Sequence, residues 1–174
     1  SQNAVLSILQ HPTIEDLKKK IVFCVGLKTK ELLNENGFTV EAYTGYAEDL
    51  AEIITLVYSD ESFTFFSGNL RRDTLPEMLS ENEITFNEIK VYDTTLTPQK
   101  ISEKVDGILF FSPSAVTSYL KKNTLANEKL FCIGNTTADA LRAVLSETKI
   151  KNIKTAYQPS VDNVIEQVIE YYNK

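Results

Sequence analysis

Serine residues open two matched segments of the sequence and could help to bind an anion. Ser1 precedes an Ala-Val pair at positions 4 and 5, and Ser112 precedes the same pair at positions 115 and 116. A serine in front of a helix adds a hydroxyl to the backbone N–H groups that the first helical turn leaves without partners. Such a turn can cap its own helix or hold a negatively charged ligand, and its recurrence favours the ligand.

A second matched pair places a glycine and a threonine after a short apolar run. The residues FCVG at 23–26 are followed by Thr29, and FCIG at 131–134 are followed by Thr137. The copies lie roughly 110 residues apart, which is too far for a solenoid repeat and suits a duplicated domain. Two such domains face to face would line a cleft with hydroxyl and amide donors. That cleft would suit a ligand with many negative charges.

Short apolar runs alternate with helical patterns along the chain. The predicted strands cover residues 20–25, 39–43, 63–67, 88–92, 107–111, 130–133 and 153–156. The predicted helices cover residues 4–9, 29–36, 47–58, 72–81, 115–122, 136–145 and 161–172. This order predicts an α/β fold with largely parallel sheets. Ligands of such sheets bind beyond the carboxyl ends of the strands, so the turns at Gly68, Ser112 and Gly134 are expected at the functional edge.

The repeat predicts two α/β domains, residues 1–95 and 96–174. Residues 92–98 lack helical periodicity and end in proline, so we expect an extended β connector between the domains. The apolar run GILFF at 107–111 precedes the second copy, whereas no equivalent run precedes Ser1. We therefore expect the sequence to be a fragment of a longer chain, with the leading strand of the first domain missing.

Composition narrows the choice of partners. The 174 residues carry a net charge of −6, which argues against a general nucleic-acid binder. No apolar stretch approaches the roughly 18–20 residues that a membrane span needs, and the cytoplasm is the expected compartment. Cys24 and Cys132 occupy corresponding repeat positions, so we expect both to be buried and unbridged.

Residues for metal or cofactor chemistry are scarce. His11 is the only histidine and lies in a polar loop, and two separated cysteines do not complete a zinc site. The sequence has no glycine-rich phosphate or dinucleotide motif and no nucleophile-elbow serine. We predict neither a metal nor a cofactor.

Two adjacent arginines, Arg71 and Arg72, stand at the start of the helix predicted at 72–81. Positive charge at a helix N-terminus opposes the helix dipole. An anion nearby would explain the pair, and a solvated surface pair is the alternative.

Four segments stand out when they are taken in order along the chain. They are SGNLRRD at 67–73 with Leu75-Pro76, Val91-Tyr92, FFSPS at 110–114 and IGNTTA at 133–138. No single motif is decisive, but their order and spacing are specific, and together they resemble the uroporphyrinogen-III synthase family. The resemblance runs from Ser1 to the helix that begins near Val161.

The resemblance implies two flavodoxin-like domains joined by a β connector, with the active site in the cleft between them. It implies that the second domain lacks the N-terminal unit that would complete its sheet. The implied substrate is hydroxymethylbilane, a linear tetrapyrrole with many carboxylates. The implied reaction closes the ring with loss of water and inversion of the last pyrrole, giving uroporphyrinogen III without a cofactor. Apart from the resemblance, we expect a monomer by default, and the charge and the short apolar runs predict no nucleic-acid or membrane partner.

The resemblance also suggests site residues. Tyr92 matches the position proposed to assist departure of the substrate hydroxyl, and a packing aromatic is the alternative. The expected substrate-binding residues are hydroxyl, glycine, amide and guanidinium groups at the strand-to-helix turns: Ser1, Thr29, Gly68, Asn69, Arg71, Ser112, Ser114, Gly134, Thr136 and Thr137.

Two other functions stay open. A non-catalytic two-domain protein that binds an anionic small molecule would show the same duplicated turns. A nucleotide- or flavin-dependent enzyme on the same fold is the third possibility, although no glycine-rich motif favours it.

Overall fold

The computed structural model describes residues 1–173, and its chain divides into two compact units, Ser1–Thr94 and Thr95–Lys174. We call them unit 1 and unit 2. Helices and strands alternate in both, and the strands pair in parallel. The predicted α/β class with parallel strand pairing is therefore confirmed, and the sheets are small.

Unit 1 contains helices and strands in alternation. They are α1 (Gln2–Ile8), α2 (Ile14–Lys18), β1 (Ile21–Val25), α3 (Leu27–Glu35), β2 (Thr39–Thr44), α4 (Ala47–Val57), β3 (Ser62–Gly68), α5 (Thr74–Glu81) and β4 (Thr85–Tyr92). Among residues 1–94, β1 pairs with β2 and β3 pairs with β4, each pair in parallel.

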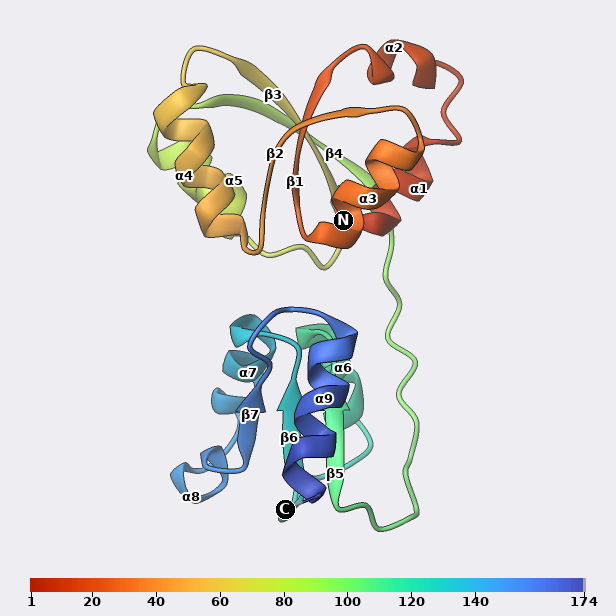
Figure 1. Ribbon diagram of the computed structural model, residues 1–174, viewed down its shortest axis with the longest axis vertical. Helices are drawn as coiled ribbons and strands as arrows, with labels where there is room; N and C mark the ends of the chain where they lie inside the picture. The colour runs from red at the N-terminus through yellow and green to blue at the C-terminus, as the bar shows by residue number, and fades with distance from the viewer. Residues whose placement is uncertain (174) are drawn as a thin grey trace. The chain divides into compact units, whose positions relative to one another are not determined.

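The strand β1 separates two apolar clusters of unit 1. Cys24 packs with Val5 of α1 and Leu33 of α3, whereas Phe23 packs with α4 and the β3 residue Phe63. This division follows from strand geometry, because successive side chains point to opposite faces. Figure 1 shows α4 beside α5 and α1 beside α3, in agreement with their contacts.

Unit 2 repeats this plan. Its elements are β5 (Gly107–Phe110), α6 (Pro113–Leu120), β6 (Lys129–Cys132), α7 (Asn135–Arg142), α8 (Glu147–Ile150), β7 (Ile153–Thr155) and α9 (Val161–Tyr172). Among the described residues of this unit, the strands form one parallel sheet in the order β5-β6-β7 (Figure 1).

The central strand of unit 2 divides its core as β1 does in unit 1. Cys132 packs toward α6 and α7, and Phe131 packs toward Val164 of α9. Phe131 is fully buried, and burying a phenylalanine stabilises the fold by about 1.5–3 kcal/mol. The two cysteines thus occupy equivalent core positions, as the duplication predicts.

Both cysteines are buried free thiols among residues 1–173, as the sequence predicted. Burial raises the pKa of the Cys132 thiol to about 11, so the neutral form persists at physiological pH. Cys132 therefore serves packing rather than nucleophilic chemistry.

The structure corrects two sequence-based expectations about local structure. The short helices α2 and α8 were not predicted, because four or five residues give too little apolar periodicity. The connector predicted as β has no strand between residues 93 and 106, within the part that the structure describes. Asn123 holds this extended segment instead, accepting from the Ile101 N–H at 2.8 Å and donating to the Gln99 carbonyl at 2.7 Å.

No helix among residues 1–173 has both the length and the apolar character to cross a membrane.

Glu88, Arg71 and Ser67 form a hydrogen-bonded cluster, here called the charged clamp, that joins the end of β3 to β4. Glu88 of β4 accepts from the Ser67 hydroxyl at 2.5 Å and from the Arg71 Nε at 2.5 Å, and its second oxygen accepts from Nη2 at 2.9 Å. The hydrogen bonds from Arg71 lower the pKa of the Glu88 carboxyl most, and the hydrogen bond from Ser67 lowers it further, so this pKa lies below its usual range. The clamp therefore favours the ionised form of Glu88 and stabilises the fold only while Glu88 is charged.

Replacing Glu88 by glutamine should lower the free energy of unfolding by about 1 kcal/mol at pH 7, since the pair is partly solvated. A carboxyl with a lowered folded-state pKa contributes stability above its unfolded pKa and loses it as the pH falls through the folded value. The difference between wild type and Glu88→Gln should therefore shrink below pH 4.5, the ordinary value.

Urea denaturation of both proteins between pH 7 and pH 3 checks this expectation. Glu52→Gln, on the exposed face of α4, is the matched control and should change little at any pH. A Glu88→Gln difference that stays constant across the range would contradict the role given to the carboxylate.

Candidate active site

Tyr92 ends strand β4, and the hydroxyl end of its ring lies close to Gly68, the last residue of β3. The strand register shifts between Ser67 and Gly68, so that Gly68 stands opposite Tyr92. A Cβ atom at Gly68 would be 2.3 Å from Cζ and 2.7 Å from the hydroxyl oxygen of Tyr92. Only glycine allows the phenol to occupy this position.

Ser1 contacts the hydroxyl of Tyr92. Ser1 is the N-cap of α1, and its Oγ accepts from the Ala4 N–H at 3.3 Å. The same Oγ donates to the Tyr92 Oη at 3.1 Å. Two predicted site residues that are 91 positions apart in sequence therefore meet at one point.

Asn69 fastens the backbone that follows Tyr92. Its N–H donates to the Tyr92 carbonyl at 3.3 Å. Its side chain accepts from the Thr94 N–H at 2.6 Å and donates to the Thr94 carbonyl at 3.2 Å. Gly68 and Asn69, expected from sequence to bind substrate, thus lie where they fix the position of Tyr92.

The arginine pair is engaged by carboxylates of the protein itself. Arg71 binds Glu88 through two nitrogens, and its third nitrogen donates to Asp73. Arg72 forms an ion pair with Glu48 at 3.3 Å. The anion expected near these arginines is therefore present within unit 1. Arg71 would contact a substrate only by sharing or exchanging these partners.

Thr29 and Thr137 occupy equivalent helix positions in the two units and are both buried. Thr29 lies in the first turn of α3 with 5% of its surface exposed, and Thr137 lies in the first turn of α7 with 2% exposed. This low exposure leaves little hydroxyl surface for a large ligand. Thr29 and Thr137 are therefore much less accessible to a ligand than Ser1, which is exposed.

Ser112 of unit 2 caps its helix as Ser1 does in unit 1, but its hydroxyl has a different second partner. Ser112 is the N-cap of α6 and accepts from the Ala115 N–H at 3.1 Å. Its Oγ lies 3.0 Å from the Oγ of Ser114. Gly134 is the N-cap of α7, and Thr136 is half-buried in the first turn of that helix. These residues lie at the carboxyl ends of β5 and β6, as predicted.

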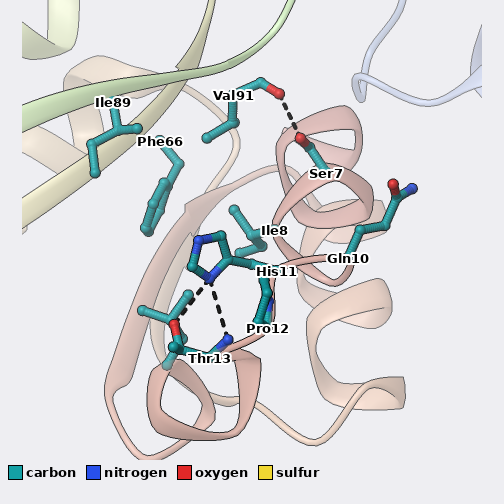
Figure 2. Close-up of a pocket in the computed structure, with 10 residues that line it drawn as sticks. Ser7, Ile8, Gln10, His11, Pro12, Thr13, Phe66, Ile89 and Val91 are labelled. Atoms are coloured by element: carbon teal, nitrogen blue, oxygen red, sulfur yellow. Dashed lines mark hydrogen bonds between the residues drawn. The ribbon is translucent and has the colours of Figure 1, made fainter.

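A separate pocket of about 440 Å³ lies in unit 1, between α1, the loop after it, β3 and β4 (Figure 2). Its walls are mainly apolar and include Ile8, Phe66 and Ile89. His11 lines it, and the His11 Nδ1 accepts from the Thr13 N–H at 3.3 Å. None of the predicted site residues lines this pocket.

Within residues 1–173, no group of three or more His, Cys, Asp or Glu side chains is arranged to hold a metal ion. The polar groups around Tyr92 are hydroxyls, amides and backbone donors. They can orient a ligand and donate protons or hydrogen bonds to it.

Sequence reasoning missed Glu88, the residue that neutralises Arg71. The available signal was an acidic residue on the strand that follows the arginine pair. That signal is weak, because the pairing depends on the register of β3 with β4 rather than on local spacing.

Gly68→Ala should push the Tyr92 ring away from Ser1 and lower the free energy of unfolding by about 1–3 kcal/mol, because the added methyl overlaps the ring. Urea denaturation measures the loss. Gly45→Ala is the matched control, since a Cβ there meets nothing within 4 Å, and it should stay within about 0.5 kcal/mol of wild type. Equal effects of the two variants would refute the close approach of ring and glycine.

Comparisons with known proteins agree with the resemblance seen in the sequence. The chain is 27% identical to a uroporphyrinogen-III synthase from Chlorobaculum parvum (strain DSM 263 / NCIMB 8327), over 163 residues. That match covers 81% of this chain and 66% of the relative, so the chain spans just under two thirds of the relative's length.

The fold is similar to a crystal structure of uroporphyrinogen-III synthetase from Helicobacter pylori 26695. The TM-score is 0.71 at 24% identity, and the match covers 98% of this chain and 80% of the other. The family model of uroporphyrinogen-III synthase HemD matches residues 1–166. The chain therefore belongs to the HemD uroporphyrinogen-III synthase family.

Proposed function

We propose that this protein is a cyclising lyase that converts hydroxymethylbilane to uroporphyrinogen III, with loss of water and inversion of the last pyrrole ring. Its place in the HemD family supports the reaction class. The observation that carries the proposal is the Tyr92 hydroxyl, held at the end of β4 by Ser1 and Gly68. A tyrosine hydroxyl can act as a general acid and donate its proton to a departing hydroxyl.

The reaction needs orientation more than a strong nucleophile. Pyrrole carbons attack the cation that forms when the hydroxyl leaves, so the protein must hold the chain in the conformation that leads to inversion. Holding reacting groups in place is worth up to several kcal/mol of barrier without covalent chemistry. Hydrogen-bond donors such as Tyr92 and Ser112 suit this task.

Substrate binding would depend on local donors, since a net charge of −6 repels a polycarboxylate at long range. Backbone N–H groups at the α6 and α7 N-termini, with the Ser112 and Ser114 hydroxyls, are the donors we propose. Arg71 contributes less, because Glu88 and Asp73 already neutralise it. Several such hydrogen bonds, each contributing about 1.5–3 kcal/mol, would together provide the free energy of substrate binding.

The proposal includes the remaining expectations from sequence. The two units would be flavodoxin-like domains that act on one substrate, and the protein would work in the cytoplasm as a monomer without a cofactor. A structure with bound product tests the first of these points directly.

Incubation with freshly prepared hydroxymethylbilane tests the activity. The substrate closes by itself to the type I isomer, so type III product in excess of a protein-free control is the expected result. Type I product alone would contradict the proposed activity and favour the non-catalytic binding protein.

Tyr92→Phe should lower kcat by about 10²–10⁴-fold, the usual contribution of a general acid, with little change in the free energy of unfolding. Tyr58→Phe is the matched control in the same unit, because it removes a tyrosine hydroxyl that is hydrogen-bonded to Glu41 at 2.7 Å. Steady-state kinetics of both variants distinguish a proton-donating Tyr92 from a Tyr92 that only packs. Equal kcat values for Tyr92→Phe and wild type would remove Tyr92 from the chemistry.

A further inference from the structure

We infer that Ser1 is a positioning residue, which directs the proton of the Tyr92 hydroxyl away from α1 and toward the substrate. The inference rests on the proposed function, in which Tyr92 is the proton donor. It replaces direct substrate binding, the role expected for Ser1 from sequence, with action through Tyr92.

The hydrogen bonds of Ser1 determine the side to which the Tyr92 hydroxyl proton can point. A serine hydroxyl has one proton and can accept through its oxygen. The Ser1 Oγ accepts from the Ala4 N–H at 3.3 Å, and its own proton goes to the Tyr92 Oη at 3.1 Å. The Tyr92 oxygen is therefore an acceptor toward Ser1, and the tyrosine proton must point elsewhere.

That proton has no acceptor among residues 1–173, although Tyr92 is only half-buried. A substrate oxygen beside Tyr92 would receive it without first breaking a protein hydrogen bond. Because each hydrogen bond in a chain polarises the next, donation from Ser1 also makes Tyr92 a stronger donor. The sequence of donors is Ala4 N–H, Ser1 hydroxyl, Tyr92 hydroxyl.

The rest of the tyrosine is already fixed, so Ser1 controls the remaining freedom. The hydroxyl end of the ring lies close to Gly68, and the Asn69 N–H donates to the Tyr92 carbonyl. What stays free is rotation of the O–H bond about the bond to the ring. The proton donated by Ser1 occupies one side of the oxygen and disfavours the rotamer that points there.

Helix capping alone does not account for this contact. Ser112 caps α6 with nearly the same geometry, yet its hydroxyl lies beside Ser114 rather than a tyrosine. Both serines serve as caps, whereas only Ser1, among these two, also forms a hydrogen bond with the hydroxyl of Tyr92. The test must therefore separate loss of a cap from loss of this second hydrogen bond.

The experiment compares Ser1→Ala, Ser1→Thr and the control Ser160→Ala in the intact protein. Ser160 caps α9 by accepting from the Asn163 N–H at 3.2 Å, so its alanine variant loses a cap of the same kind. Ser1→Ala should lower kcat by about 3- to 10-fold with KM changed less than about 2-fold, as expected for one hydrogen bond. Ser1→Thr should restore most of kcat, and Ser160→Ala should leave it unchanged.

A double variant tests whether Ser1 acts through Tyr92. In the Tyr92→Phe background, Ser1→Ala should cause no further loss of kcat, because the hydroxyl it orients is gone. An equal loss in both backgrounds, or a rise in KM in both, would show that Ser1 contacts the substrate itself and would overturn the inference.

A spectroscopic readout is independent of turnover. The ¹³Cζ resonance of labelled Tyr92 senses hydrogen bonds to its oxygen, and it should shift in Ser1→Ala and not in Ser160→Ala. An unchanged resonance together with unchanged kcat would overturn the inference. If wild type forms no type III isomer, the proposed function fails, and the resonance alone then decides whether Ser1 holds the tyrosine hydroxyl.

Discussion

The close approach of the Tyr92 ring to the backbone at Gly68 is the constraint on which the site depends. The absence of a side chain at Gly68 leaves room for a phenol where a Cβ would lie 2.3 Å from the ring. The register shift between Ser67 and Gly68 sets these two residues opposite each other. With the ring fixed there, the hydroxyl reaches Ser1 of α1, so two strands and a helix converge on one oxygen.

The two units share a core arrangement and differ in the partners of their capping serines. Cys24 and Cys132 fill equivalent core positions, and Thr29 and Thr137 are both buried. The serines that cap α1 and α6 each accept a hydrogen bond from the backbone N–H three residues later. Their second partners differ, Tyr92 for Ser1 and Ser114 for Ser112. Buried positions must keep their volume because interiors are closely packed, whereas a half-exposed hydroxyl can change partner at little cost.

Carboxylates of unit 1 neutralise its arginine pair, and this shapes how an anion could bind. Arg71 and Arg72 face Glu88, Asp73 and Glu48, so the arginine pair adds little net positive potential. Hydroxyl and backbone N–H donors keep their strength without a counter-charge. A protein with a net charge of −6 can therefore offer a polycarboxylate directed hydrogen bonds even though its long-range field is repulsive.

The sequence by itself determined the α/β class, nearly all longer helices and strands, and the burial of the cysteines, because periodicity and capping are local properties. It also pointed to Tyr92 and to the turns around it. Only the tertiary structure decided which of these residues meet. Ser1 and Tyr92 are 91 positions apart, and Glu88 neutralises Arg71 across a strand pair. Such contacts depend on strand register and helix packing, which many distant residues set together and no local pattern encodes.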